Sequence, residues 1–167
     1  RNFQLALLRP LLGRADVELV VRSGSLAELL AQLAAHTLDL VLANAPVPRD
    51  AETAWQCALL DQQPVSLVGR ARDRRRRLRL PADLDGLPML LPSRASSLRA
   101  AFDLVTEQAG VRPRILAEVD DMAMLRLLAR ASPAVALVPP VVVRDELAAG
   151  VLRELCAVPG LTESFYA

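Results

Sequence analysis

The spacing of hydrophobic residues along the chain predicts a regular order of helices and strands. Leucines three and four residues apart mark two amphipathic helices, at residues 5–12 and 26–33, the first ending at Gly13. Short apolar runs at 17–22 and 38–43 predict strands. These runs are nearly continuous rather than alternating, which favours a parallel sheet covered on both faces.

The middle of the chain is less regular, and a second strand–helix–strand half is expected around residues 88–138. Apolar runs predict strands at 57–60, 63–69, 88–91, 114–119 and 134–138. Helices are expected at 98–109, from residue 122 and at 141–149, followed by one or two strands in the tail from residue 151. The pattern therefore predicts an α/β protein made of two lobes, each built from strand–helix–strand units.

Polar residues stand where helices are expected to begin. Ser25 is followed three residues later by Glu28, which is a capping-box pattern. Residues 93–97 are polar and precede a helix, and Asp120 or Asp121 is expected to cap the next one. Each position fits a cap alone, and each also fits a ligand contact, because helix N-termini present free N–H groups.

Composition narrows the class of protein. The 167 residues are 53% hydrophobic and carry a net charge of only +1, so the chain is expected to fold rather than to be disordered. A near-neutral balance gives no strong signature of nucleic-acid binding. The arginine run from Arg70 to Arg79 is expected to be a solvated loop, with phosphate contact as the alternative.

The residues that carry catalysis are scarce. His36 is the only histidine and is expected to be exposed or to cap a helix end. Cys57 and Cys156 are far apart and form neither a disulfide framework nor a zinc pattern, although a redox switch is an alternative. No nucleophile elbow or phosphate loop is visible. We therefore expect no enzyme, no cofactor and no metal.

The sequence also bears on location. No apolar stretch reaches the length of about 18 residues that suggests a membrane span. The first residues, 1–4, do not resemble a signal peptide. We expect a cytoplasmic protein that does not contact the membrane.

The order of several motifs resembles the LysR-type transcription regulators. The first is residues 16–25 (DVELVVRSGS) with 37–42 (TLDLVL), which is similar to that family's strand, glycine turn, helix and second strand. The second is 64–68 (PVSLV) with 80–88 (LPADLDGLP). The third is 118–121 (EVDD) with 135–139 (VALVP). Residues 36–39 and 44–48 are further similar to the sodium/proton-antiporter activator subgroup.

The resemblance implies a fold of two Rossmann-like lobes, similar to type II periplasmic binding proteins. It places lobe I at residues 1–66 and 141–167 and lobe II at 67–140. The family's first strand and its DNA-binding winged helix-turn-helix are expected to lie outside this chain. In place of the family's Gly-x-Gly before residue 135, the chain has residues 132–134 (SPA), so the turn there is expected to differ.

The function that the resemblance implies is sensing of a small molecule or ion in a cleft between the lobes. The chain would be the effector-binding and dimerisation domain of the regulator, forming a homodimer or homotetramer and reaching DNA only through the missing domain. The alternative is a transporter's solute-binding protein of the same fold, which would need a secretion signal. The residues expected near the effector are Asn2, Ser23, Ser25, Asn44, Pro46, Pro92, Ser93, Ser96, Asp120, Met122 and Pro139.

Overall fold

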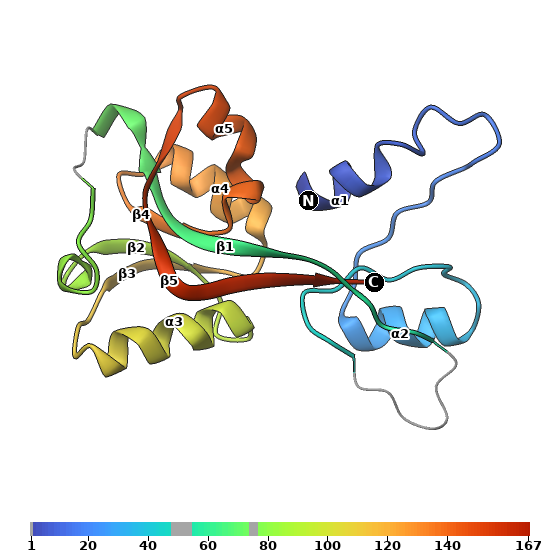
Figure 1. The fold of residues 1–167 in the computed structure, drawn as a ribbon, viewed down its shortest axis with the longest axis horizontal. Coiled ribbons are helices and arrows are strands. Elements are labelled where there is room, and N and C mark those ends of the chain that lie inside the picture. The colour runs from blue at the N-terminus through green and yellow to red at the C-terminus, as the bar shows by residue number, and fades with distance from the viewer. Residues whose placement is uncertain (1, 48–54, 74–76) are drawn as a thin grey trace. The chain divides into compact units, whose positions relative to one another are not determined.

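The computed structural model describes residues 2–47, 55–73 and 77–167 (Figure 1). The middle of the arginine run, residues 74–76, lies outside the described residues. The chain divides into two compact units. Unit 1 consists of residues 63–163 with residues 2–3, and unit 2 of residues 4–62 and 164–167. The predicted boundaries of lobes I and II stay a prediction.

Unit 1 is built on a mixed sheet whose strand order is β3-β2-β4-β1-β5. The strands are β1 (Leu59–Arg70), β2 (Pro88–Pro92), β3 (Arg114–Val119), β4 (Val135–Val138) and β5 (Leu152–Tyr166). Strand β2 runs parallel to β3 and β4, whereas β1 is antiparallel to β4. Strands β1 and β5 are long, and each has its outermost residues in unit 2.

The two faces of this sheet carry separate hydrophobic clusters. Met89 and Leu91 of β2 pack on one face with Phe102 of helix α3 (Ser97–Gln108). Leu90, between them in sequence, points to the other face and packs with Leu125 of helix α4 (Met122–Ala131). This alternation is the two-residue period of a strand, and both faces are covered by a helix (Figure 1). The sheet of unit 1 is therefore buried on both sides, although the runs at 17–22 and 38–43, from which such a sheet was predicted, are not among its strands.

The connection after β4 differs from the single helix predicted at 141–149. A 3₁₀ turn, η3 (Pro140–Val143), comes first, and the short helix α5 (Arg144–Ala148) follows it. Pro140 and the three valines after it are poor residues for an α-helix interior, which explains the split. The tail forms one continuous strand, β5, and the two strands expected at 57–60 and 63–69 are joined in β1.

Unit 2 contains fewer of the predicted elements. Helix α2 (Leu26–Ala34) lies where the leucine spacing placed it, but no residue of α2 is fully buried. The strands expected at 17–22 and 38–43 are not formed, so that prediction is wrong. Among the described residues of unit 2, only Ala43 forms an isolated β-bridge, with Tyr166. An apolar run becomes a strand only when a hydrogen-bonded neighbour is present.

Helix α1 (Asn2–Leu8) is shorter than the helix predicted at 5–12. Arg9 still donates its backbone N–H to Leu5 O, at 2.9 Å. Pro10 follows, and proline has no N–H to continue this ladder and disfavours a helical residue before it. Along the described part of the chain, none of the helices combines the length and the apolar composition that crossing a bilayer requires.

Candidate functional site

The predicted site residues of unit 1 follow the ends of the parallel strands. Pro92 ends β2, Asp120 follows β3, and Pro139 follows β4. Because β2, β3 and β4 are parallel, these positions share the carboxyl edge of the sheet, where α/β proteins bind ligands. The backbone N–H of Ser93 donates to Val119 O at 3.0 Å, which joins the segments after β2 and β3 directly.

Ser96 occupies the N-cap of α3 without acting as a side-chain cap. Its backbone is extended, with φ −80° and ψ 131°, as an N-cap residue requires. Its hydroxyl makes no cap hydrogen bond and is buried without a partner among the described residues. A buried hydroxyl without a partner costs free energy, so the described residues leave this hydrogen-bonding group unsatisfied. We call residues 92–97 the serine segment.

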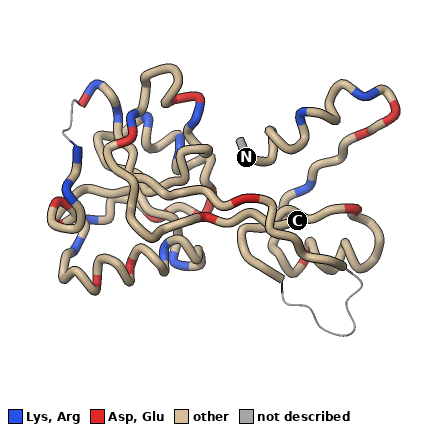
Figure 2. Tube along the Cα trace, viewed as in Figure 1, with Lys and Arg blue, Asp and Glu red and all other residues tan. Residues whose placement is uncertain are grey.

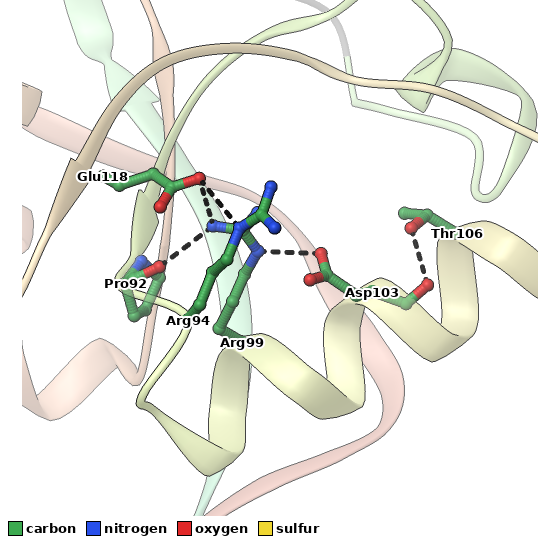
Figure 3. A network of polar contacts seen from close by, with 6 residues as sticks. All are labelled: Pro92, Arg94, Arg99, Asp103, Thr106 and Glu118. Carbon is green, nitrogen blue, oxygen red and sulfur yellow. Dashed lines mark hydrogen bonds and ion pairs between the residues drawn. The ribbon is translucent and has the colours of Figure 1, made fainter.

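The arginine three residues after Ser96 turns inward and holds the serine segment in place (Figure 3). The Arg99 side chain is 3% exposed. Its Nη1 donates to Pro92 O at 3.2 Å and lies 3.2 Å from Glu118 Oε1 on β3. Its Nε donates to Asp103 Oδ1 at 2.7 Å, one turn further along α3. Arg99 thereby ties the end of β2, the end of β3 and the start of α3 to one another.

Both positively and negatively charged side chains lie at the serine segment. Burial lowers the pKa of Arg99, but hydrogen bonds and charge interactions with Asp103 and Glu118 outweigh it and raise the pKa overall, so the guanidinium stays charged. Arg94 is 79% exposed, and its Nε lies 3.7 Å from Glu118 Oε1. Because that distance exceeds a hydrogen bond and the side chain is open to solvent, Arg94 retains donors for another anion.

The remaining predicted residues of unit 1 divide by role. Asp121, rather than Asp120, caps α4, its Oδ1 accepting from Ala123 N at 3.0 Å. Asp120 is exposed. Met122 is half-buried against both hydrophobic clusters. Pro139 is buried and precedes η3, so Met122 and Pro139 shape the sheet edge rather than offer polar atoms.

In unit 2, the predicted capping box is confirmed. Ser25 Oγ accepts from Glu28 N at 3.3 Å, and Glu28 Oε2 accepts from Ser25 N at 3.0 Å. Ser23, Asn44 and Pro46 are exposed. Asn2 begins α1, and its side chain lies outside the described part of the structure.

A pocket of about 730 Å³ lies within unit 2, among other residues than those predicted. Its apolar lining includes Leu30, Leu33, Val41, Trp55 and Tyr166. The indole Nε1 of Trp55 is buried without a partner among the described residues. None of the residues expected near the effector lines this pocket.

Sequence reasoning missed the importance of Arg99. A signal was present, because Leu98 and Phe102 form an apolar helical face and Arg99 lies between them in sequence. A charged residue on a buried face needs an opposite charge within reach, and Asp103 stands four residues later. The second partner, Glu118, is on another strand and could be found only from the folded chain.

The turn before β4 is closed by a serine side chain. Ser132 ends α4, and its Oγ accepts from Ala134 N at 3.3 Å. The side chain thus supplies the bond that closes this turn. The expected difference from the family's glycine turn stays a prediction.

Groups that bind metals or react covalently do not gather in the described residues. No group of three or more His, Cys, Asp and Glu side chains is placed to hold a metal ion in residues 2–47, 55–73 and 77–167. His36 is exposed, with φ 55°. Cys57 and Cys156 are free thiols, and burial raises the pKa of Cys156. A protonated thiol is a weak nucleophile, which argues against a reactive Cys156.

Comparison with known proteins identifies the family. The sequence model of the LysR substrate binding domain matches residues 5–167. Comparison with curated proteins gives no match. Among solved structures, the regulatory domain of CcmR from Synechocystis PCC6803 in complex with 2-PG has a TM-score of 0.71 at 15% identity, covering 98% of this chain and 79% of that one.

Two longer chains are similar over the same region. DarR from Vibrio fischeri in complex with DNA has a TM-score of 0.72 at 17% identity, covering 98% of this chain and 58% of that one. Full-length HypT from Salmonella typhimurium has a TM-score of 0.68 at 14% identity, covering 98% and 56%. The sodium/proton-antiporter activator subgroup is not confirmed, and a transporter's solute-binding protein is not favoured. The chain belongs to the LysR substrate-binding domain family, the effector-binding domain of LysR-type transcription regulators, with its type II periplasmic-binding-protein-like fold.

Proposed function

We propose that the serine segment of unit 1 binds the anionic group of a small effector and reports it to the regulator. The observation that carries this proposal is the hydroxyl of Ser96, which is buried, stands at a helix N-terminus and has no partner among the described residues. The first turn of a helix leaves N–H groups unpaired and has a positive dipole end. A carboxylate or similar anion there would accept from these N–H groups and from Ser96 Oγ.

The nearby charges support an anion rather than a cation. Arg99 is fixed and charged, and Arg94 is exposed with free donors. Glu118 offsets part of this positive charge, but its Oε1 is already shared by both arginines. An entering carboxylate would replace Glu118 as the partner of Arg94 without disturbing the buried contact of Arg99.

The ligands of similar domains agree with this class. The regulatory domain of HypT from Salmonella typhimurium has been solved with bromide bound, and the effector binding domain of QuiR with shikimate. We propose that Pro92, Ser93, Asp120, Met122 and Pro139 complete the effector contacts on unit 1. The predicted contacts on unit 2, with Asn2, stay part of the proposal and rest on the family resemblance.

We further propose the wider context of the domain. The regulator would be a homodimer or homotetramer, reach DNA through a separate domain and work in the cytoplasm, where its operator is. The domain would act by binding alone, without an enzymatic step. Effector binding can shift the regulator only through a different affinity for its two states. Light scattering on the purified chain tests the oligomer.

A thermal-shift panel tests the effector proposal. The melting temperature of the purified chain is measured with small carboxylates, with aromatic acids and with sodium salts. Each value is compared with the melting temperature in sodium chloride at equal ionic strength. A ligand at about a hundredfold its Kd adds roughly 2.7 kcal/mol of stability. Ser97→Ala is the matched control, because Ser97 is the exposed neighbour of Ser96.

The outcomes separate the proposal from its alternatives. A carboxylate that stabilises the chain and the Ser97→Ala variant, but not Ser96→Ala, supports the serine segment as the site. A stabilising ligand that Ser96→Ala binds as tightly as the unchanged chain contradicts it.

A further inference from the structure

Unit 1 has a second hollow that the effector proposal does not use. Its volume is about 190 Å³, and it is lined by Arg70, Arg72, Arg130, Gly150 and Val151. Three of these residues are arginines, and none is acidic. We call this site the arginine hollow. Asp73 and Glu146 offset part of the charge of Arg70 and Arg130, but the lining itself is basic, and guanidinium groups around one space repel one another less when an anion shares it.

The arginine hollow and the serine segment lie at opposite ends of the strands of the sheet. Arg70 ends β1, which is antiparallel to β4, with Val68 opposite Ala136. The end of β1 therefore lies beside the amino end of β4. Arg130 stands in the last turn of α4, just before β4 begins. The serine segment follows the carboxyl end of β2, which is parallel to β4, so the two sites are separated by the length of the strands.

Arg70 forms a fixed wall of the hollow. Its Nε and Nη2 donate to the two oxygens of Asp73 at 3.0 and 2.8 Å. Its Nη1 donates to Ala131 O at 3.3 Å. The side chain is only 12% exposed, and each of its three nitrogens is engaged. Arg70 therefore contributes charge and shape, and its binding capacity is largely used.

Arg72 and Arg130 retain guanidinium N–H donors for a ligand. Arg72 is exposed and makes no hydrogen bond or ion pair with any residue in the described part of the chain. Arg130 Nη1 is 3.7 Å from Glu146 Oε1, which is too far for a hydrogen bond. That oxygen is taken by Arg126 Nε at 2.6 Å. Arg130 thus shares the charge of Glu146 without a hydrogen bond to it, and it lines the hollow with N–H donors that remain available.

We propose that the arginine hollow binds a phosphate-class oxyanion, held by Arg72 and Arg130 against the fixed Arg70. Guanidinium forks match the oxygen spacing of phosphate and form charge-assisted hydrogen bonds. Attraction of a helix C-terminus for cations accounts for Arg130 in the last turn of α4, but not for Arg72 on η1 (Ala71–Asp73). In Figure 2, basic positions (blue) and acidic positions (red) lie close together along the chain in unit 1.

Titration of the purified chain with inorganic phosphate tests this site, with sodium chloride at equal ionic strength as the reference. Arg72→Gln and Arg130→Gln each remove one charged donor, and the Kd for phosphate is expected to rise about tenfold or more in each. Arg114→Gln is the control, because Arg114 is an exposed arginine on edge strand β3. Arg114→Gln and Ser96→Ala are expected to bind phosphate as the unchanged chain does.

A carboxylate placed in the hollow gives an independent measurement. Val151 is 42% exposed and lines the hollow, so Val151→Glu is tolerated and mimics a bound anion. This variant is expected to raise Tm and to lose the phosphate response. Since the Arg72 side chain makes no hydrogen bond or ion pair with a described residue, Arg72→Gln is expected to stay folded, so a loss of phosphate binding in this variant reports on the site.

Three results would overturn the proposal. The first is a phosphate response no larger than the chloride response. The second is an equal loss of binding in Arg114→Gln and Arg72→Gln, which would indicate diffuse attraction. The third is no phosphate binding together with duplex DNA binding that Arg72→Gln abolishes, which would assign the arginines to nucleic acid. Loss of effector binding in Ser96→Ala leaves the arginine hollow untouched.

Discussion

Helices α2 and α3 both begin at an extended serine, yet the two serines do different things. Ser25 has φ −65° and ψ 152°, and its hydroxyl is engaged with Glu28, three residues later. Ser96 has nearly the same backbone conformation, but Arg99 stands in the position of Glu28. The arginine side chain has no acceptor for Ser96, so no capping box forms, and the Ser96 hydroxyl also makes no bond to the backbone N–H groups of the first turn.

The two helix starts are stabilised by different kinds of contact. The start of α2 is held by residues that are neighbours in sequence, and no residue of α2 is fully buried. The start of α3 is held from a distance, by Arg99 bound to Pro92 O and Glu118 and by Leu98 and Phe102 in the core. A helix that is anchored by tertiary contacts can leave its cap position open for a ligand.

The largest expected contrast is in core packing. Phe102→Ala should lower the free energy of unfolding by about 3–5 kcal/mol, because it leaves a cavity among fully buried residues. Leu29→Ala on α2 should cost less than about 1.5 kcal/mol, since Leu29 is only half-buried. Urea denaturation followed by circular dichroism measures both. Equal losses would show that α2 is packed as tightly as α3.

The next effect concerns the buried arginine. Arg99→Met keeps the aliphatic stem but removes the donors to Pro92 O, Asp103 and Glu118, and should cost about 2 kcal/mol. Arg94→Met is the matched control on the same carboxylate and should change stability by less than about 0.5 kcal/mol, because Arg94 is solvent-exposed. If Arg94→Met proves the more costly, the anchoring role of Arg99 is wrong.

Replacing each of the two cap serines by alanine tests the comparison directly. Ser25→Ala should cost about 1 kcal/mol, because a working N-cap is lost. Ser96→Ala should cost less than about 0.5 kcal/mol without ligand, since the Ser96 hydroxyl makes no bond to lose. Thermal melts of both variants without ligand measure the two losses of stability. A large loss in Ser96→Ala would mean that the hydroxyl already has a partner in the free protein.

The smallest effect is the pH dependence of α2. The hydrogen bond with the Ser25 side chain, followed by the bond from its backbone N–H, lowers the pKa of Glu28 in the folded chain. A carboxyl whose folded pKa is lowered stabilises the fold above its unfolded pKa, and this contribution is lost as pH falls through the folded pKa. Helicity should therefore decline slightly on acidification, and Glu28→Gln should remove that part of the decline in circular dichroism.

Sequence patterns succeeded where the stabilising contacts are local or strongly periodic. The strand at 114–119 has the predicted bounds, and α3 and α4 begin within one residue of expectation. The predicted strands at 17–22 and 38–43 failed because strand formation depends on a neighbour that the run itself does not specify. The serine segment was placed correctly at a helix start, but its open hydroxyl was not foreseen.

The sequence by itself determined the order of elements in unit 1, the capping box of α2 and the membership of a regulator family. These follow from spacings of a few residues and from motif order, which the chain carries without folding. The folded structure was needed to show that the Ser96 hydroxyl is buried without a partner among the described residues, and that Arg99 reaches Glu118 on another strand. It also brought Arg70, Arg72 and Arg130 around one hollow. These contacts join residues distant in sequence, and only the pairing of strands and the burial of helices brings them together.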